Sequence, residues 1–153
     1  MELLNNDEYY MREALREADA AAEAGEVPVG AVIVYGDKII ARGRNARESD
    51  KNALRHAELT AIDIACGVRV GWRLTDCTMY VTLEPCPMCA GAIINARIPR
   101  VVYGAKDARA GALGSVLNMS AYPLGWRPDV TSGVRADVCA DVLSRFFAGL
   151  RNR

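Results

Sequence analysis

The sequence has a single histidine, no long apolar run and no excess of charge of either sign. Nineteen basic and nineteen acidic residues cancel, so no global positive field indicates nucleic-acid binding, and any such binding must depend on local patches. No apolar run reaches the roughly 18 residues of a spanning helix. Residues 1–25 also lack the basic start and apolar stretch of a secretory signal. These absences predict a cytoplasmic protein without a membrane-spanning segment.

The cysteines form an odd set: Cys66, Cys77, Cys86, Cys89 and Cys139. In a chain without a secretion signal, an odd number argues against a disulfide framework and favours thiol or metal chemistry. The two closest together, Cys86 and Cys89, have the Cys-x-x-Cys spacing. This pair is therefore the first candidate for thiol or metal chemistry.

The length and the apolar periodicity predict one compact α/β domain. A chain of 153 residues, 51% hydrophobic, is long enough for one core and too short for two ordinary domains. Asp7 is expected to cap a first helix that ends at Gly25. The elements expected after it are strands over 28–35 and 38–43, a helix over 56–66, a strand over 77–83, a helix starting near Pro87 and a strand over 100–104.

The final segment, residues 136–153, has the pattern of an amphipathic helix. Its apolar residues expected to face inward are Val138, Val142, Leu143, Phe146 and Phe147. Strands that alternate with helices along the chain imply a three-layer α/β/α sandwich rather than a helical bundle.

One histidine and two cysteines form a candidate metal site. His56 lies at the start of one predicted helix, and Cys86 and Cys89 lie at the start of another. One imidazole and two thiolates make a three-ligand tetrahedral zinc set with a fourth position open to water, which indicates catalysis. A helix N-terminus turns both sulfurs toward one point and favours thiolates. Glu58 projects at a different angle from His56, so it is placed to carry protons for a water that zinc makes acidic.

Each part of this pattern has a plainer interpretation when taken alone. A lone histidine is more often a core or surface residue than a ligand, and a Cys-x-x-Cys is as often a redox pair. Glu58 alone would be an ordinary solvated helix residue. A closed structural zinc site would need a fourth ligand, and the three other cysteines have no motif spacing to the pair. Taken together, the residues match a specific signature.

The pattern His-Ala-Glu at 56–58 followed by Pro-Cys-x-x-Cys at 85–89 is similar to that of the zinc-dependent nucleobase and nucleoside deaminases. Nearly the whole chain resembles the bacterial tRNA-specific adenosine deaminases, through "EVPVGAVIV", Arg44-Asn45, residues 80–115 and "LSRFFAGLR". The resemblance implies one cytidine-deaminase-like domain over residues 1–153, with a central mixed sheet of about five strands. It also implies hydrolysis of adenosine to inosine and ammonia at the wobble position of tRNA, one zinc per chain and a homodimer.

The resemblance implies roles for individual residues at the reacting centre. His56, Cys86 and Cys89 would bind zinc. Glu58 would take a proton from the zinc-bound water and pass it to the ring nitrogen and then to the amine that leaves C6 of adenine.

Four further residues would form the substrate pocket on the same resemblance. Asn45 would contact the nucleoside, Val29 and Leu83 would supply apolar walls, and Asp107 would lie close to the ribose. Plainer interpretations stay open, because Val29 and Leu83 are strand residues that belong to the core in many folds. Asn45 and Asp107 are equally suited to capping turns.

Contact with tRNA would depend on basic side chains near the site and on the final helix: Arg97, Arg100, Lys106, Arg109, Arg145, Arg151 and Arg153. Charges on a terminal helix are equally its solvated face. A base in an RNA loop would have to be splayed into the pocket, and Phe146 or Phe147 would either help this or belong to the core.

Two departures from the family pattern leave substrate selectivity open. Residues 52–55 read Asn-Ala-Leu-Arg where relatives often have Asp-Pro-Thr-Ala, and residues 118–130 carry Trp126-Arg127 where relatives often have Asn-His. Both are expected to lie around the substrate rather than at the metal. The alternatives are therefore a deaminase of a free base such as guanine or cytosine, and a non-catalytic zinc or RNA-binding module that would tolerate loss of Glu58.

Overall fold

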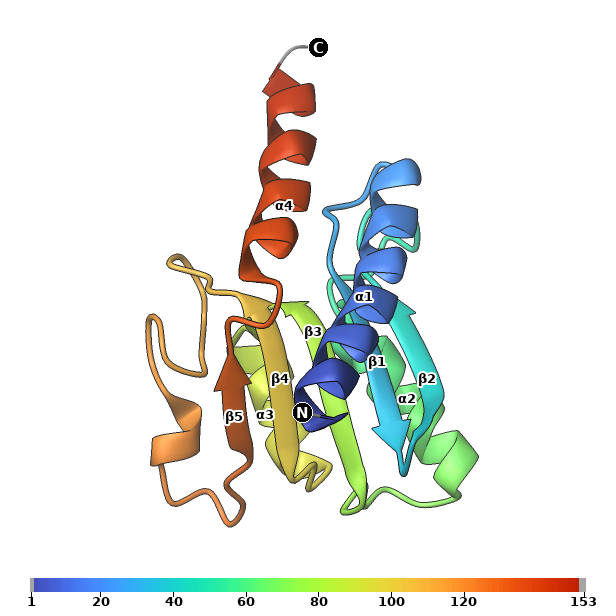
Figure 1. Ribbon diagram of the computed structural model, residues 1–153, viewed down its shortest axis with the longest axis vertical. Coiled ribbons are helices and arrows are strands. Elements are labelled where there is room, and N and C mark those ends of the chain that lie inside the picture. The colour runs from blue at the N-terminus through green and yellow to red at the C-terminus, as the bar shows by residue number, and fades with distance from the viewer. Residues whose placement is uncertain (1, 152–153) are drawn as a thin grey trace.

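A five-stranded mixed sheet forms the centre of the protein, as seen in the computed structural model, which describes residues 2–151 (Figure 1). The strands are β1 (Gly30–Tyr35), β2 (Lys38–Arg44), β3 (Cys77–Leu83), β4 (Arg100–Ala105) and β5 (Asp129–Ser132). Their spatial order is β2-β1-β3-β4-β5. β1 is antiparallel to both β2 and β3, whereas β3, β4 and β5 run parallel. The predicted mixed sheet is thereby confirmed.

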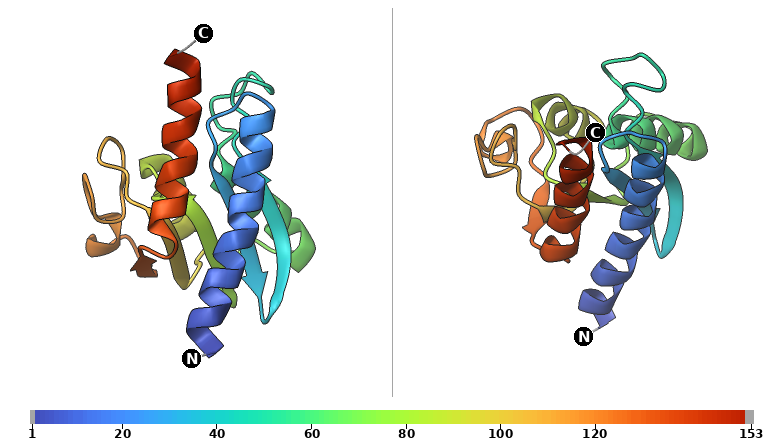
Figure 2. Two further views of the ribbon diagram at one scale, coloured as in Figure 1. Left: turned by 45° about the horizontal axis from the view of Figure 1, so that its top comes forward. Right: turned by 90° about the horizontal axis from the view of Figure 1, so that it is seen from above.

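Two helices cover each face of the sheet. α1 (Glu2–Glu23) and α4 (Ala136–Arg151) lie on one face, and α2 (Ala57–Arg69) and α3 (Pro87–Asn95) lie on the other (Figures 1 and 2). A short 3-10 helix, η1 (Met119–Ala121), lies between β4 and β5. The arrangement confirms the predicted three-layer α/β/α sandwich. Over residues 2–151, no helix combines the length and the hydropathy needed to cross a bilayer.

The strands are apolar on both sides because both faces of the sheet are buried. In β1, Ala31 and Ile33 belong to the core shared with α2 and α3, while Val32 and Val34 belong to the core shared with α1 and α4. Successive strand side chains point to opposite faces. A continuous apolar run is therefore the pattern of a covered strand, as the sequence predicted for β1.

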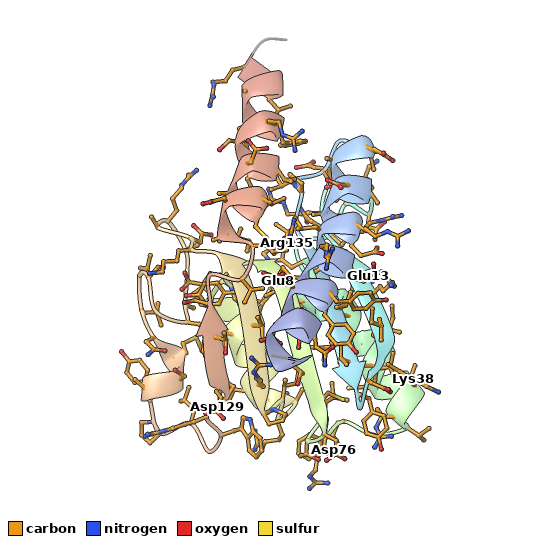
Figure 3. All side chains as sticks on the ribbon, in the orientation of Figure 1. Glu8, Glu13, Lys38, Asp76, Asp129 and Arg135 are labelled. Atoms are coloured by element: carbon orange, nitrogen blue, oxygen red, sulfur yellow. The ribbon has the colours of Figure 1, made fainter. Side chains whose placement is uncertain are left out.

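The parallel strands fix which edge of the sheet can hold a site. Asp76 and Asp129, labelled in Figure 3, mark the edge where β3 and β5 begin. The carboxyl ends of β3 and β4 lie at the opposite edge, together with the start of β1 and the end of β2, because Gly30 pairs with Arg44. Ligands of open α/β sheets bind outside the carboxyl ends of the strands. We call this edge the carboxyl edge.

Gly43 sets how closely α2 approaches the sheet. A Cβ atom at this position would collide with the backbone carbonyl oxygen of Ala57 and crowd the backbone nitrogen of Ala61. Only a residue without a side chain allows the first turn of α2 to lie directly on β2. This contact places the start of α2, and with it His56, at the carboxyl edge.

The structure corrects the predicted role of Asp7. α1 begins at Glu2, so Asp7 lies within the helix and does not cap it. The Asp7 carboxylate is 6% exposed and accepts hydrogen bonds from the Tyr80 hydroxyl at 2.6 Å and from Arg100 Nη1 and Nη2 at 2.9 and 2.7 Å. A carboxylate that suits a helix cap is used here for a buried ion pair with the sheet. The predicted end of the helix is confirmed by Gly25, whose φ is +81°.

Two further boundaries differ from the prediction. α2 continues two residues past Gly67 and ends at Arg69, and its C-cap residue Val70 takes the left-handed conformation with φ of 54°. β5 and η1 were not predicted. β5 has four residues, of which two are half-buried and two exposed, so its sequence carries little apolar signal.

The inward face predicted for the final helix is wrong in part. Val142 is buried, Leu143 and Phe146 are half-buried, and Val138 and Phe147 are each 39% exposed. For Phe147 the reason is geometric, since the second half of α4 rises beyond the carboxyl edge of the sheet (Figures 1 and 2). No strand lies beneath it there.

Candidate active site

A cavity of about 190 Å³ opens at the carboxyl edge of the sheet. Its walls come from the segments before β1 and after β2, β3 and β4, and from the start of α2. The residues that line it are Val27, Val29, Asn45, Arg47, His56, Ala57, Glu58, Leu83, Glu84, Cys86, Asp107 and Ala110. We call this cavity the pocket.

The three predicted metal ligands meet beside the pocket. His56 Nδ1 lies 3.6 Å from Cys86 Sγ and 3.6 Å from Cys89 Sγ. All three donor atoms lie within 4.8 Å of one another, and no other metal-binding group of three or more side chains was found in residues 2–151. A tetrahedral zinc ion bonded to nitrogen at about 2.1 Å and to sulfur at about 2.3 Å holds these atoms roughly 3.6 Å apart. The spacing of the donors therefore fits zinc.

The positions of these ligands follow from local structure. His56 precedes the first turn of α2 and Cys86 precedes that of α3, each with an extended backbone. Pro87 occupies the first turn of α3, where its missing N–H is not needed. Neither helix start carries a side-chain cap, and in the first turn of α3 the Cys89 backbone N–H donates to Cys86. The positive ends of both helices favour thiolates there.

The electrostatics of the sulfurs also fit a cation. Hydrogen bonds from Cys89 and His56 lower the pKa of Cys86 to about 4. The pKa of Cys89 is raised, because its thiol donates to Cys86 and is buried near the charges of Glu58 and Cys86. One sulfur thus ionises at the expense of the other. A dication among the three donors would stabilise both thiolates together.

Glu58 lies in the first turn of α2 and is 4% exposed. Its carboxylate lines the pocket but is not one of the three meeting donor atoms. Burial is the main cause that raises the pKa of Glu58 to about 7. A carboxyl group that titrates near neutrality can both accept and donate a proton at working pH.

The four predicted substrate residues, Val29, Asn45, Leu83 and Asp107, all line the pocket. The side chain of Asn45 also holds its own loop. Its Nδ2 donates to the Val27 carbonyl at 3.2 Å, and its Oδ1 accepts from the Arg47 backbone N–H at 3.3 Å. Asp107 likewise caps a turn. The pocket and turn interpretations are therefore compatible for both residues.

Two charged pocket residues were missed from the sequence, Arg47 and Glu84. Arg47 follows Asn45 by two residues, and its approach to the pocket depends on the fold of the 45–55 loop. Glu84 directly precedes the Pro-Cys motif, a position that marks it as close to the site. Burial alone would raise the pKa of Glu84, but hydrogen bonds from Ser115 and from three backbone N–H groups hold that pKa below its usual value.

Two of the predicted RNA-contact residues lie at the wrong edge of the sheet. Arg97 precedes β4 and donates to the Ile94 carbonyl at 2.8 Å. Arg100 begins β4 and is paired with Asp7 at 2.7 Å. Both lie opposite the carboxyl edge, so the expectation that they are near the site is wrong. The two guanidinium groups are instead used in contacts within the fold.

The other basic candidates have different surroundings. Lys106 and Arg109 are exposed and flank Asp107 at the pocket wall. Arg145 is exposed on α4 and pairs with Asp141 at 2.8 Å. Arg151 is the last residue of α4 and is exposed, while Arg153 lies outside the described residues.

The two sequence departures also separate in space. Residues 52–55 directly precede His56, and Arg55 pairs with Asp50 at 3.5 Å. Trp126, by contrast, donates its Nε1 proton to the Ile98 carbonyl at 2.8 Å, which lies at the edge opposite the pocket. The expectation that the second departure surrounds the substrate is wrong for Trp126.

Comparisons with known proteins agree with this geometry. A family model of MafB19-like deaminases matches residues 5–134. The chain is 46% identical to a tRNA-specific adenosine deaminase of Bacillus subtilis (strain 168) over 151 residues, which cover 98% of this chain and 94% of that protein. A solved structure from work on A-to-I editing by tRNA:A34 deaminases at the wobble position of transfer RNA is 42% identical. It covers 88% of this chain and 99% of its own, with a TM-score of 0.85.

A solved guanine deaminase from Nitrosomonas europaea is 22% identical, with a TM-score of 0.75 over 92% of this chain and 84% of its own. At that identity the likeness concerns the fold alone. The family match and the 46% identical relative reach further, because they cover most or nearly all of the chain. The chain therefore belongs to the deaminase family that includes the tRNA-specific adenosine deaminases.

Proposed function

We propose that the protein hydrolyses adenosine to inosine, with release of ammonia, at the wobble position of tRNA. The observation that carries the proposal is the meeting of His56 Nδ1 with Cys86 Sγ and Cys89 Sγ, 3.6 Å from each, beside a pocket that also contains buried Glu58. The substrate is suggested by two relatives. The one at 46% identity is a tRNA-specific adenosine deaminase, and the one at 42% comes from work on deaminases that edit the wobble position of tRNA.

His56, Cys86 and Cys89 are the residues that would hold the zinc ion, one per chain. When bound, zinc acts as a Lewis acid that makes water a nucleophile at neutral pH. With three protein ligands, such an ion would keep one coordination position open to water. The donor spacing and the two helix N-termini support this assignment.

Glu58 would move the protons of the reaction. Its carboxylate takes a proton from the attacking water, delivers one to the ring nitrogen next to C6 of adenine, and then protonates the amine that leaves. Water adds to C6 and the C6–N6 bond breaks, so adenosine and water become inosine and ammonia. The position of Glu58 in the pocket wall and its burial in the first turn of α2 suit this sequence of transfers.

The pocket would hold the base and exclude the rest of the RNA. Val29 and Leu83 would pack on the adenine ring, while Asn45 and Asp107 would bind polar groups of the nucleoside. Its volume of about 190 Å³ is below the roughly 300 Å³ of a typical drug-sized site. A single base fits this description better than a folded RNA segment, so the wobble adenosine would be splayed out of the anticodon loop.

The tRNA itself would be bound by exposed cations around the pocket. Lys106 and Arg109 flank Asp107, and Arg145 and Arg151 lie on α4; Arg153 remains a prediction from the sequence. We further infer one deaminase domain over residues 1–153, supported by two cores that share one sheet. A homodimer and a cytoplasmic location stay predictions.

The proposal is tested by comparing substrates in a salt series. Zinc-loaded protein is incubated with an anticodon stem-loop that has adenosine at the wobble position, and separately with adenosine, adenine, guanine and cytosine. Inosine and ammonia are measured. Inosine is expected in the stem-loop, with a rate that falls as salt rises, because phosphate contacts release counterions. Turnover of guanine or cytosine without inosine in the stem-loop would refute the substrate, and absence of any ammonia would favour a non-catalytic module.

A pair of arginine variants locates the RNA surface. Arg109→Ala should lower the rate on the stem-loop and reduce the slope of log rate against log salt by roughly 0.7, the value for one phosphate contact on a single strand. Arg97→Ala is the matched control, because Arg97 lies at the opposite edge of the sheet. Equal slopes for both variants would contradict an RNA contact by Arg109.

A further inference from the structure

Two buried carboxylates lie at the two sides of the pocket. Glu26 precedes β1, on the side formed by the 45–55 loop, and Glu84 follows β3, on the side formed by the segment after β4. Each residue is 2% exposed. Neither has a salt bridge to a lysine or arginine within the described part of the chain. A buried charge is expensive unless hydrogen bonds satisfy it, so the partners of these two groups matter.

Glu84 binds the segment that carries Asp107. Its Oε1 accepts from the Asp107 backbone N–H at 3.1 Å, and its Oε2 accepts from the backbone N–H groups of Leu113 and Ser115 at 3.1 and 3.0 Å. The Ser115 hydroxyl donates to the same carboxylate. One side chain therefore fixes both ends of the 107–115 loop, which forms a wall of the pocket through Asp107 and Ala110.

Gly111 lets this loop close around the carboxylate. A Cβ atom there would collide with Cδ and Oε1 of Glu84 and with the Asp107 carbonyl oxygen. The loop thus folds onto Glu84 at a glycine, where no side chain stands in the way. Within the loop, Asp107 Oδ1 accepts from the backbone N–H groups of Arg109 and Ala110 at 2.9 and 3.2 Å, so the Asp107 carboxylate is oriented by the same turn that Glu84 anchors.

Glu26 binds the opposite loop with the same kinds of donor. Its Oε1 accepts from the Glu48 backbone N–H at 3.1 Å, and its Oε2 accepts from the Ser49 backbone N–H at 2.6 Å and from the Ser49 hydroxyl at 2.5 Å. Arg47, which lines the pocket, is the residue directly before this anchor. The two sides of the pocket are therefore each tied to a buried glutamate through backbone N–H groups and one serine hydroxyl.

These donors require carboxylates. A carboxylate accepts hydrogen bonds on both oxygens, whereas a glutamine amide accepts on one atom and donates from the other. At Glu84 and at Glu26 both oxygens face N–H or O–H donors, so a glutamine would place its NH₂ group against a donor. Loop order here thus depends on the second oxygen, and not only on the size of the side chain.

We propose that Glu84 and Glu26 are positioning residues that hold the two loops of the pocket in their substrate-binding arrangement before the substrate arrives. The proposal rests on the proposed function for its substrate. Neither residue is assigned a contact with the reacting atoms. Glu84 acts through Asp107, and Glu26 acts through Arg47. Because the loops are already ordered, substrate binding does not carry the free-energy cost of ordering them.

The first experiment separates positioning from stability. Glu84→Gln is compared with Asp7→Asn, which removes a buried carboxylate on the other side of the sheet. For zinc-loaded Glu84→Gln we expect KM for the stem-loop to rise between about ten- and a hundredfold, with a smaller change in kcat, because the misplaced part is the wall and not the reacting centre. Zinc content should stay near that of the wild type. For Asp7→Asn we expect a lower unfolding temperature with an unchanged KM.

Two readouts keep the test decisive. Hydrogen exchange of the 107–115 amides should speed up in Glu84→Gln and not in Asp7→Asn. Ser115→Ala, which keeps the carboxylate and removes one donor, is the milder variant if Glu84→Gln does not fold, and it should raise KM by a smaller factor. An unchanged KM in folded Glu84→Gln, or in Ser115→Ala where that variant replaces it, would overturn the proposal and leave Glu84 a structural residue.

A double variant tests the route of the effect. If Glu84 acts through Asp107, the rise in KM of Glu84→Gln combined with Asp107→Asn should be well below the product of the two single effects. A full product would show that Glu84 does not act through Asp107. Glu26→Gln should speed exchange of the Glu48 and Ser49 amides and lower kcat/KM on the stem-loop.

Failure of the positioning proposal can be distinguished from failure of the proposed function. If the wild type forms no inosine in the stem-loop, the substrate assignment fails. Hydrogen exchange of the two loops in Glu84→Gln and Glu26→Gln then decides the positioning proposal without any substrate. Protection equal to that of the wild type in both loops would overturn it, and selective loss of protection would support it.

Discussion

Replacing Glu58 by Gln should abolish most turnover and leave the zinc site intact. Glu58 lines the pocket, whereas the donor atoms that meet are those of His56, Cys86 and Cys89. Glutamine keeps the size of the side chain and the burial of the first turn of α2. It cannot accept and return a proton, so the change removes the proposed proton carrier and little else.

The size of the effect follows from how Glu58 is enclosed. A positioned proton carrier contributes about 10²- to 10⁴-fold to a rate. Because Glu58 is 4% exposed, bulk water has little access to take over its task, and the loss should lie in the upper part of that range. A fall of about 10³- to 10⁴-fold corresponds to about 4–5.5 kcal/mol of transition-state stabilisation.

The assay measures inosine formed in the stem-loop under single-turnover conditions, with zinc per chain determined by mass spectrometry on the same samples. Asp63→Asn is the matched control, because Asp63 is an exposed carboxylate on the same helix. The control should keep both zinc and rate. Zinc lost together with Glu58 would make Glu58 a ligand, and a rate within tenfold of the wild type would assign the proton transfer to another group.

Three further changes test the site and the fold. Cys89→Ala should lose most of the zinc, because two protein ligands make a weak site, while Cys66→Ala should keep it; full occupancy in the first variant would contradict the ligand set. Gly43→Ala should weaken zinc binding in a metal competition assay, since the added methyl group displaces the start of α2; unchanged affinity would refute the role of that contact. Asp7→Asn should lower the unfolding free energy in urea at pH 7 by about 3 kcal/mol, at the low end for a broken buried pair because the Arg100 side chain is 35% exposed. Burial alone would raise the pKa of Asp7, but hydrogen bonds from Arg100 and Tyr80 hold that pKa below 3.8. The stabilisation by this carboxylate is therefore complete above about pH 4 and is lost as pH falls through the folded-state pKa. The unfolding free energies of wild type and variant should converge in acid, and a constant difference between them down to pH 2 would count against the ion pair.

The candidate site can be predicted from the sequence, because its residues lie a short distance apart along the chain. His56 and Glu58 share one helix start, and Cys86 and Cys89 share another, so spacing alone assigns each pair a common location. The apolar runs of β1 and β3 likewise report burial on both faces. Such local patterns predict the three layers, which the structure confirms, and they select the candidates for the metal donors and the proton carrier.

Which charged groups belong to the pocket cannot be predicted from the sequence, because it depends on contacts between distant parts of the chain. Asp7 and Arg100 are 93 residues apart in the chain, and nothing in either local pattern marks them as partners. The sequence therefore predicts a helix cap for Asp7 and an RNA contact for Arg100. Glu26 and Glu84 are similar cases, since a glutamate becomes a buried anchor only when a distant loop brings its N–H groups. A charge acts through what surrounds it in space, and the surroundings of these residues are set by the pairing and packing of distant strands and loops.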